Sequence, residues 1–98
     1  MREAEFQSKL IKKLKLIFPG CTVLKNDTSY SPGVPDLTVL YNDKWAMLEV
    51  KASSTATERP NQRYYVDQMN AASFAAFIYP ENEEEVLDGI QLAFGRNR

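Results

Sequence analysis

Residues 36–51 constrain the fold more than any other part of the chain. Two runs of strand-forming residues, 36–41 and 44–51, are separated only by Asn42-Asp43. Asn and Asp tolerate the positive φ values of tight turns, so the segment predicts a β-hairpin with a two-residue loop. In that register Tyr41 faces Lys44, and continuing it places Asp36 directly across from Glu49.

This register sorts the hairpin side chains onto two faces. Alternate residues of a strand point to opposite faces, so Glu49 and Lys51 share one face, with Asp36 beside them. The other face would be wholly apolar, comprising Leu37, Val39, Ala46, Leu48 and Val50. The pattern therefore predicts a sheet that is buried on one face and carries two acids and a lysine on the other.

Two carboxylates at facing positions lie about 5 Å apart and repel each other. They are tolerated in three ways: by a shared proton, by a bound cation, or by full exposure to water. Full exposure would make Lys51 an ordinary salt-bridge partner on a solvated surface. We favour the cation, because apolar strand residues flank Asp36 and Glu49 and a Gly-x-Pro turn precedes Asp36. A divalent cation beside a positioned amine is what phosphodiester hydrolysis requires.

The motifs GVPDL at 33–37 and LEVK at 48–51 resemble those of the PD-(D/E)XK nuclease superfamily. The closest resemblance is to the virus-type replication-repair nuclease group (VRR-NUC), which includes small phage proteins and Holliday-junction resolvase relatives. Residues 60–62 and 25–27 also fit, and the resemblance spans most of residues 3–80. It implies a restriction-endonuclease-like fold. It also implies a metal-dependent DNA endonuclease that acts in phage-type DNA replication, recombination or repair, and that could resolve Holliday junctions or other branched DNA.

The resemblance also implies roles for individual residues. Asp36, Glu49 and the backbone carbonyl of Val50 would hold Mg²⁺ or Mn²⁺. Lys51 would orient or deprotonate the attacking water and offset developing charge. Gln62 would align a water, although most glutamines in the first turn of a helix are merely solvated.

Three further residues are candidates for the same site. Glu3 falls within the apolar stripe of the first helix and resembles a glutamate that approaches the metal in resolvase-like nucleases. Alternatively, it is a first-turn residue favoured by the helix dipole. Lys25 resembles a basic residue beside the scissile phosphate, and Tyr30 lies in a polar loop where it could contact DNA.

The remaining pattern predicts an α/β fold. Apolar periodicity and Pro/Gly boundaries predict helices at 3–18, 60–73 and 83–94, and strands at 21–26 and 74–79. The order αβββαβα gives a mixed four-stranded sheet flanked by helices. We therefore expect one domain covering residues 1–98.

Composition limits the chemistry and the partners. The chain has no histidine, which excludes His-dependent zinc sites and Ser-His-Asp hydrolysis, and its single cysteine cannot form an internal disulfide. No apolar run reaches the roughly 20 residues needed to cross a bilayer, and the N-terminus lacks the apolar core of a secretion signal. We therefore expect a cytoplasmic protein, in the host cytoplasm if a phage encodes it.

The charge distribution bears on nucleic-acid binding. Residues 1–63 carry a net charge of +3 and residues 64–98 carry −4, so the half that contains the candidate site is basic. This is compatible with one surface that faces DNA. Junction resolvases of similar size act as two-fold dimers, so we expect a homodimer. Two alternatives remain: a non-catalytic DNA-binding module on a nuclease fold, and an unrelated α/β interaction domain.

Overall fold

The computed structural model describes residues 1–95 and contains the predicted elements in the predicted order. The elements are α1 (Glu3–Ile17), β1 (Thr22–Lys25), β2 (Leu37–Tyr41), β3 (Lys44–Val50), α2 (Gln62–Ala72), β4 (Phe74–Ile78) and α3 (Glu83–Ala93). One boundary differs from the prediction by two residues. Helix α2 begins at Gln62 because Asn61 adopts a left-handed conformation, with φ of 71°.

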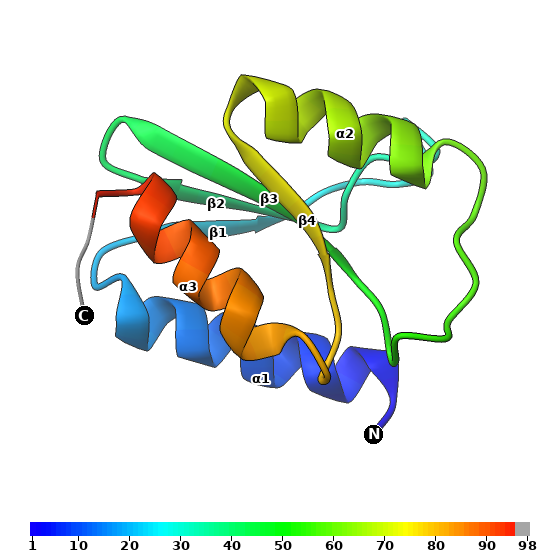
Figure 1. Cartoon of the computed structure of the whole chain (residues 1–98), viewed down its shortest axis with the longest axis horizontal. Helices are drawn as coiled ribbons and strands as arrows, with labels where there is room; N and C mark the ends of the chain where they lie inside the picture. The colour runs from blue at the N-terminus through cyan, green and yellow to red at the C-terminus, as the bar shows by residue number, and fades with distance from the viewer. Residues whose placement is uncertain (96–98) are drawn as a thin grey trace.

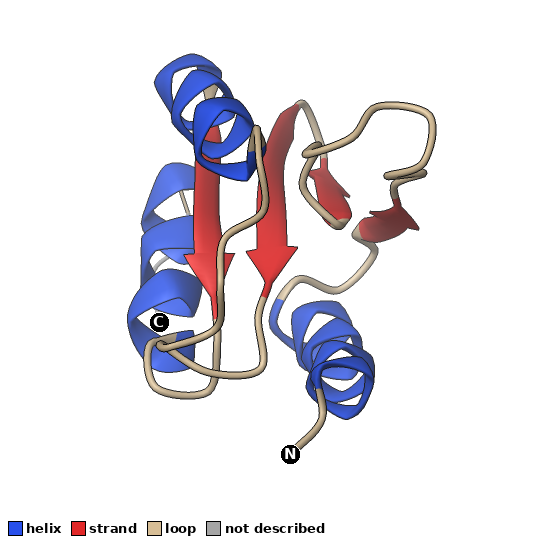
Figure 2. Ribbon diagram, turned by 90° about the vertical axis from the view of Figure 1, so that its right-hand side faces the viewer, coloured by secondary structure: helices blue, strands red, loops and turns tan. Residues whose placement is uncertain are grey.

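The four strands form one mixed sheet in the order β1-β2-β3-β4. Strands β1, β2 and β3 pair in an antiparallel meander, and β4 joins β3 in parallel after the crossover through α2. Figures 1 and 2 show α2 on one side of the sheet, and α1 and α3 on the other. The predicted α/β class and topology are therefore confirmed.

The hairpin register is also as predicted. Tyr41 pairs with Lys44 and Leu37 pairs with Leu48. The two-residue loop is possible because Asn42 adopts a positive φ of 57°, which asparagine tolerates better than most residues. Extending this register by one position places Asp36 opposite Glu49.

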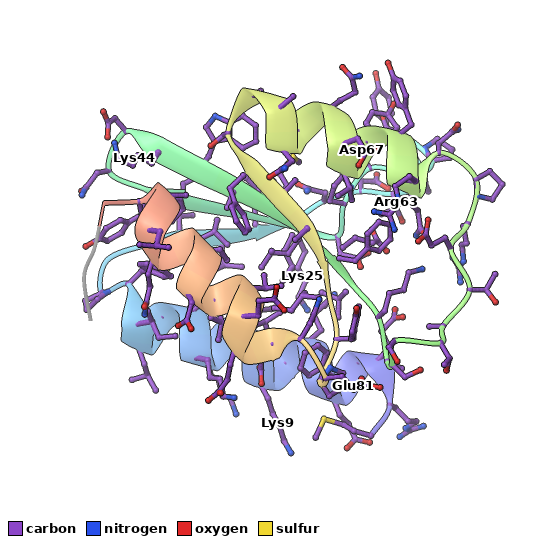
Figure 3. All side chains as sticks on the ribbon, viewed as in Figure 1. Lys9, Lys25, Lys44, Arg63, Asp67 and Glu81 are labelled. Atoms are coloured by element: carbon purple, nitrogen blue, oxygen red, sulfur yellow. The ribbon has the colours of Figure 1, made fainter. Side chains whose placement is uncertain are left out.

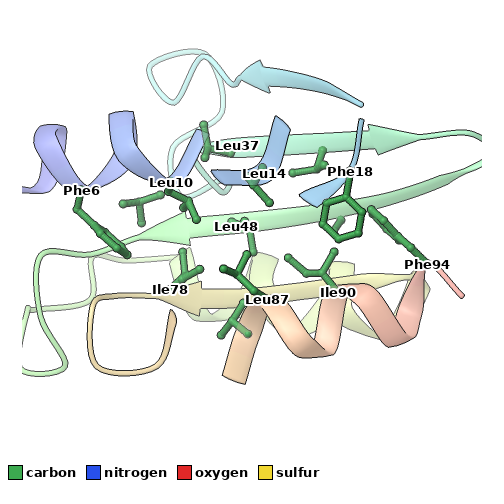
Figure 4. Packing of buried hydrophobic residues seen from close by; sticks show 14 residues of the cluster. Phe6, Leu10, Leu14, Phe18, Leu37, Leu48, Ile78, Leu87, Ile90 and Phe94 are labelled. Carbon is green, nitrogen blue, oxygen red and sulfur yellow. The ribbon is translucent and has the colours of Figure 1, made fainter. Parts of the chain in front are cut away.

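The hydrophobic core lies between the sheet and the α1/α3 layer (Figure 4). All five apolar residues predicted for this face of the hairpin are fully buried. They pack against Phe6, Leu10 and Leu14 of α1, and against Val86, Leu87 and Ile90 of α3. A slip of one residue in the hairpin would turn these side chains outward, so the core fixes the register that brings the acids together.

None of the helices within residues 1–95 is both long enough and apolar enough to cross a membrane.

Candidate active site

The backbone at the end of β3 orients Asp36. The backbone N–H of Val50 donates a hydrogen bond to Asp36 Oδ2 at 2.9 Å. The N–H and C=O of one strand residue point toward the same neighbouring strand, so the Val50 carbonyl faces the side on which Asp36 lies. Asp36, the Val50 carbonyl and the facing Glu49 thus supply oxygen atoms at one end of the hairpin.

Gln62, the first residue of α2, joins the acid to the lysine. Its Nε2 donates to Glu49 Oε2 at 2.8 Å, and its Oε1 accepts a hydrogen bond from Lys51 Nζ at 2.8 Å. The backbone N–H of Arg59 donates to the same Oε1 at 2.7 Å, which fixes the orientation of the amide. Glu49, Lys51 and Gln62 are only 3%, 7% and 7% exposed. These three residues are therefore not part of a solvated surface.

The loop between β3 and α2 holds the amine of Lys51. Lys51 Nζ donates to the carbonyl oxygen of Thr57 at 3.0 Å and lies 3.9 Å from Glu49 Oε2. An ammonium group has three N–H donors, so its contacts with Thr57, Gln62 and Glu49 leave it little freedom to move. The position of Lys51 therefore depends on the conformation of residues 52–61 as well as on β3.

The environment of Glu49 disfavours its ionised form. Burial, followed by the nearby charge of Asp36, raises the pKa of Glu49 to about 8, although Lys51 acts in the opposite direction. A hydrogen bond with the Asp36 carboxyl group and the negative charge of Glu3 raise this pKa further. Glu49 Oε1 is buried and receives no hydrogen bond from residues 1–95. The ionised form of Glu49 is therefore disfavoured unless a cation offsets the negative charge of the pair.

Five predicted site residues line one pocket of about 310 Å³: Glu3, Asp36, Glu49, Lys51 and Gln62. Glu3 comes from α1 and Gln62 from α2, on opposite sides of the sheet, and the other three residues come from the hairpin. The rest of the lining comes from two loops, one at residues 28–34 and one at residues 59–61. The fold thus gathers most of the predicted residues around a single cavity.

Gly33 allows these two loops to approach each other. Its φ is +95°, and a Cβ atom built there would lie 2.6 Å from Cβ of Asn61. Asn26 fixes the other end of its loop, because its Nδ2 donates to the carbonyl oxygen of Pro35 and to Thr38 Oγ1, at 2.8 and 3.0 Å. The pocket wall therefore requires glycine at position 33.

The donor set fits a hard divalent cation such as Mg²⁺ or Mn²⁺. Two carboxylates and a backbone carbonyl are the oxygen ligands that these ions prefer, and no group within residues 1–95 donates a hydrogen bond to the buried Glu49 Oε1. Within residues 1–95 no three His, Cys, Asp or Glu side chains are grouped as a metal site. A cation here would be held by Asp36, Glu49, the Val50 carbonyl and water. Glu3 lines the same pocket, and its approach to the metal stays a prediction.

The two predicted DNA contacts lie away from this pocket. Lys25 pairs with Leu37 in the sheet, and cross-strand partners project from the same face. The Lys25 side chain is therefore on the core face of the sheet, opposite to the face that carries Glu49. Tyr30 is 87% exposed in its loop. Within residues 1–95, neither Lys25 nor Tyr30 lines the 310 Å³ cavity. Their contact with DNA stays a prediction.

The sequence pattern did not reveal two contributors to the site. Arg59 lines the pocket and is exposed, and Thr57 supplies a carbonyl oxygen to Lys51. Arg59 directly precedes residues 60–62, which fit the nuclease resemblance, and this adjacency is the one signal for it in the sequence. The role of Thr57 involves a backbone atom, which no residue pattern specifies.

A scan against models of protein families finds no match to this chain, and a search of curated proteins finds no significant sequence match. The functional interpretation therefore depends on the residues and on their geometry.

Proposed function

We propose that this protein is a divalent-metal-dependent endonuclease that hydrolyses phosphodiester bonds in DNA. The observation that carries the proposal is the buried group of Asp36, Glu49 and Lys51, which Gln62 joins at one pocket. Surface charges of an interaction domain have no reason to be buried together with the pKa of one acid raised, because burial of a charge is costly. Such clusters of perturbed groups are typical of functional sites.

Each side chain has a distinct role in the proposed reaction. A divalent cation bound here would polarise the scissile phosphate and lower the pKa of water. Asp36 and Glu49 supply the negative charge that attracts the cation. Lys51, which Gln62 and the Thr57 carbonyl hold in place, orients the attacking water and offsets charge that develops on the phosphate.

Arg59 extends the proposed substrate contact to the mouth of the pocket. The guanidinium group is always charged and can donate two parallel hydrogen bonds to phosphate oxygens. Arg59 is exposed and lines the pocket, so it can reach a phosphate without breaking an ion pair with any residue in the described part of the chain. It is therefore suited to bind the DNA backbone beside the scissile bond.

A cleavage assay with a matched pair of variants tests the proposal. Purified protein is incubated with Mg²⁺, Mn²⁺ or EDTA and with supercoiled, linear, single-stranded or four-way-junction DNA. The proposal is supported if cutting needs the metal, is lost in Asp36→Asn and Lys51→Ala, and persists in Asp43→Asn. Asp43 is a suitable control because it is an exposed acid on the same hairpin.

Two other results would point elsewhere. A shift in DNA mobility without cutting would favour the non-catalytic DNA-binding module, and neither binding nor cutting would favour the unrelated interaction domain. The expected products carry 5′-phosphate and 3′-hydroxyl ends. The proposed homodimer is tested separately by light scattering on the purified protein, with and without junction DNA.

A further inference from the structure

A second cavity, of about 420 Å³, lies between α2 and β4 and is closed at one end by the loop after β3. We call it the α2/β4 groove. Lys51 lines both this groove and the candidate active site, so the two cavities adjoin at the lysine. The proposed reaction gives the groove no role.

The walls of the groove follow from the periodicities of its two elements. Ala75, Phe77 and Tyr79 alternate along β4 and its end and so share one face, and Phe77 pairs with Glu49 of the candidate site. Arg63 and Asp67, four residues apart, lie on one side of α2 (Figure 3). The groove therefore lies on the same face of the sheet as the acids.

Arg63 provides a fixed flat surface in this groove. Its guanidinium carbon lies 4.3 Å from the centroid of the Phe77 ring. Its Nε and Nη2 donate to the two carboxylate oxygens of Glu58 at 3.3 and 2.5 Å. An arginine held at two nitrogen atoms and against a ring is oriented in advance, so binding of a planar group costs little conformational entropy.

The remaining walls are held by hydrogen bonds. Glu81 Oε2 accepts hydrogen bonds from the backbone N–H and the hydroxyl of Ser54, at 3.2 and 3.1 Å. Asn70 Oδ1 accepts from the backbone N–H of Ala75 at 3.0 Å. Asn82 bonds to the backbone of β4 and its end, donating to the Phe77 carbonyl and accepting from the Tyr79 N–H. The groove is therefore formed before any ligand binds.

The charges in the groove balance. Lys51 and Arg63 are opposed by Glu58 and Asp67, so neither an anion such as phosphate nor a cation is favoured. What remains is a flat guanidinium beside aromatic rings, with amide and hydroxyl groups around it. This combination suits a neutral, planar group that both donates and accepts hydrogen bonds. Bases unstacked from a helix are bound in this way, by aromatic rings and arginine planes.

We propose that the α2/β4 groove binds one unpaired nucleobase of the DNA strand that is cut, next to the scissile phosphate. This inference rests on the proposed nuclease function. A base within an intact duplex cannot reach the groove without leaving the stack, which is costly. The protein therefore selects DNA with unpaired nucleotides beside the cut, such as an overhang, a flap or the branch of a junction.

Matched substrates test this inference. One duplex carries a single-stranded overhang, and a second is identical except that the overhang nucleotides beside the cut are abasic. Stacking of one base on protein side chains gives roughly a tenfold effect, so we expect wild-type kcat/KM to fall about tenfold on the abasic substrate. Arg63→Gln should cut both substrates at the same reduced rate. Arg2→Gln is the control, because Arg2 is also an exposed arginine that pairs with a glutamate.

The outcomes separate the two proposals. If the wild type cuts both substrates equally well, the base-binding groove is refuted while the nuclease stands. If no DNA is cut with any metal, the nuclease proposal fails, and fluorescence anisotropy with the same two oligonucleotides in EDTA then decides on the groove. Weaker binding of the abasic oligonucleotide would support the groove, and equal binding would overturn it. Both comparisons use the wild type, so neither depends on whether Arg63→Gln folds.

Discussion

Replacing Glu49 with glutamine should stabilise the metal-free protein at alkaline pH while removing its activity. Burial and the charge of Asp36 raise the pKa of Glu49 from an ordinary 4.5 to about 8. Between these two pH values the folded protein keeps a proton that the unfolded chain has lost. The contribution of Glu49 to the free energy of unfolding therefore falls as pH rises from about 4.5 to about 8, and it is constant above pH 8.

The magnitude follows from the difference between the two pKa values. A tenfold difference in proton affinity corresponds to about 1.4 kcal/mol, so the full cost of ionising Glu49 would be about 5 kcal/mol. Rearrangement of the site and entry of water when Glu49 ionises reduce this cost, and we therefore expect about 2 kcal/mol. Glutamine cannot ionise, and its amide can donate a hydrogen bond to the facing Asp36 side chain. The variant should exceed the wild type by less than about 1 kcal/mol at pH 5 and by about 2 kcal/mol at pH 9, the latter being roughly 10 °C in Tm.

Urea denaturation in EDTA at pH 5, 7 and 9, followed by the fluorescence of the single tryptophan, Trp45, measures this difference. Glu5→Gln serves as the control because Glu5 is an exposed acid in α1, and its stability relative to the wild type should not change with pH. A Glu49→Gln variant that is no more stable than the wild type at pH 9 would refute the account of a strained acid pair. Adding Mg²⁺ at pH 9 should stabilise the wild type and leave the variant nearly unchanged.

Three further predictions concern the walls of the active-site pocket. Gly33→Ala should destabilise the protein by about 1–3 kcal/mol in urea denaturation, because its Cβ would meet Asn61 and its φ is positive; wild-type stability would show that the loops can separate freely. Arg59→Ala should raise KM for DNA. It should also reduce the slope of the logarithm of the DNA-binding constant against the logarithm of the salt concentration by about 1, since one phosphate contact is lost; an unchanged slope would exclude that contact. Gln62→Ala should lower kcat about 10–100-fold in a cleavage assay with a smaller change in KM, because Lys51 loses a partner; an effect on KM alone would contradict a positioning role.

The fold was predictable from the sequence because local and tertiary preferences agree. Asn42 suits the positive φ of the hairpin loop, and the apolar residues of both strands fall on one face only in the register that this loop sets. The facing positions of Asp36 and Glu49 follow from the same register. These features depend on residues close together in the sequence, where periodicity is informative.

The surroundings of Lys51 were less predictable because they depend on distant contacts. The loop of residues 52–61 takes its course partly from the bond between Ser54 and Glu81, which are 27 residues apart. Only that course brings the Thr57 carbonyl to Lys51 and makes Gln62 a buried residue rather than a solvated one. Arg59 reaches the pocket for the same reason. No periodic pattern in the sequence encodes these contacts.

The asparagine side chains along β4 also bear on how copies of this chain can associate. An exposed strand edge is a template for pairing with another chain, and Asn70 and Asn82 occupy backbone groups at the outer edge of β4. Both asparagines bond to the side of β4 that faces away from β3, so another strand could add there only by breaking these bonds. The side chains thus protect part of this edge in a sheet that would otherwise end in an open strand.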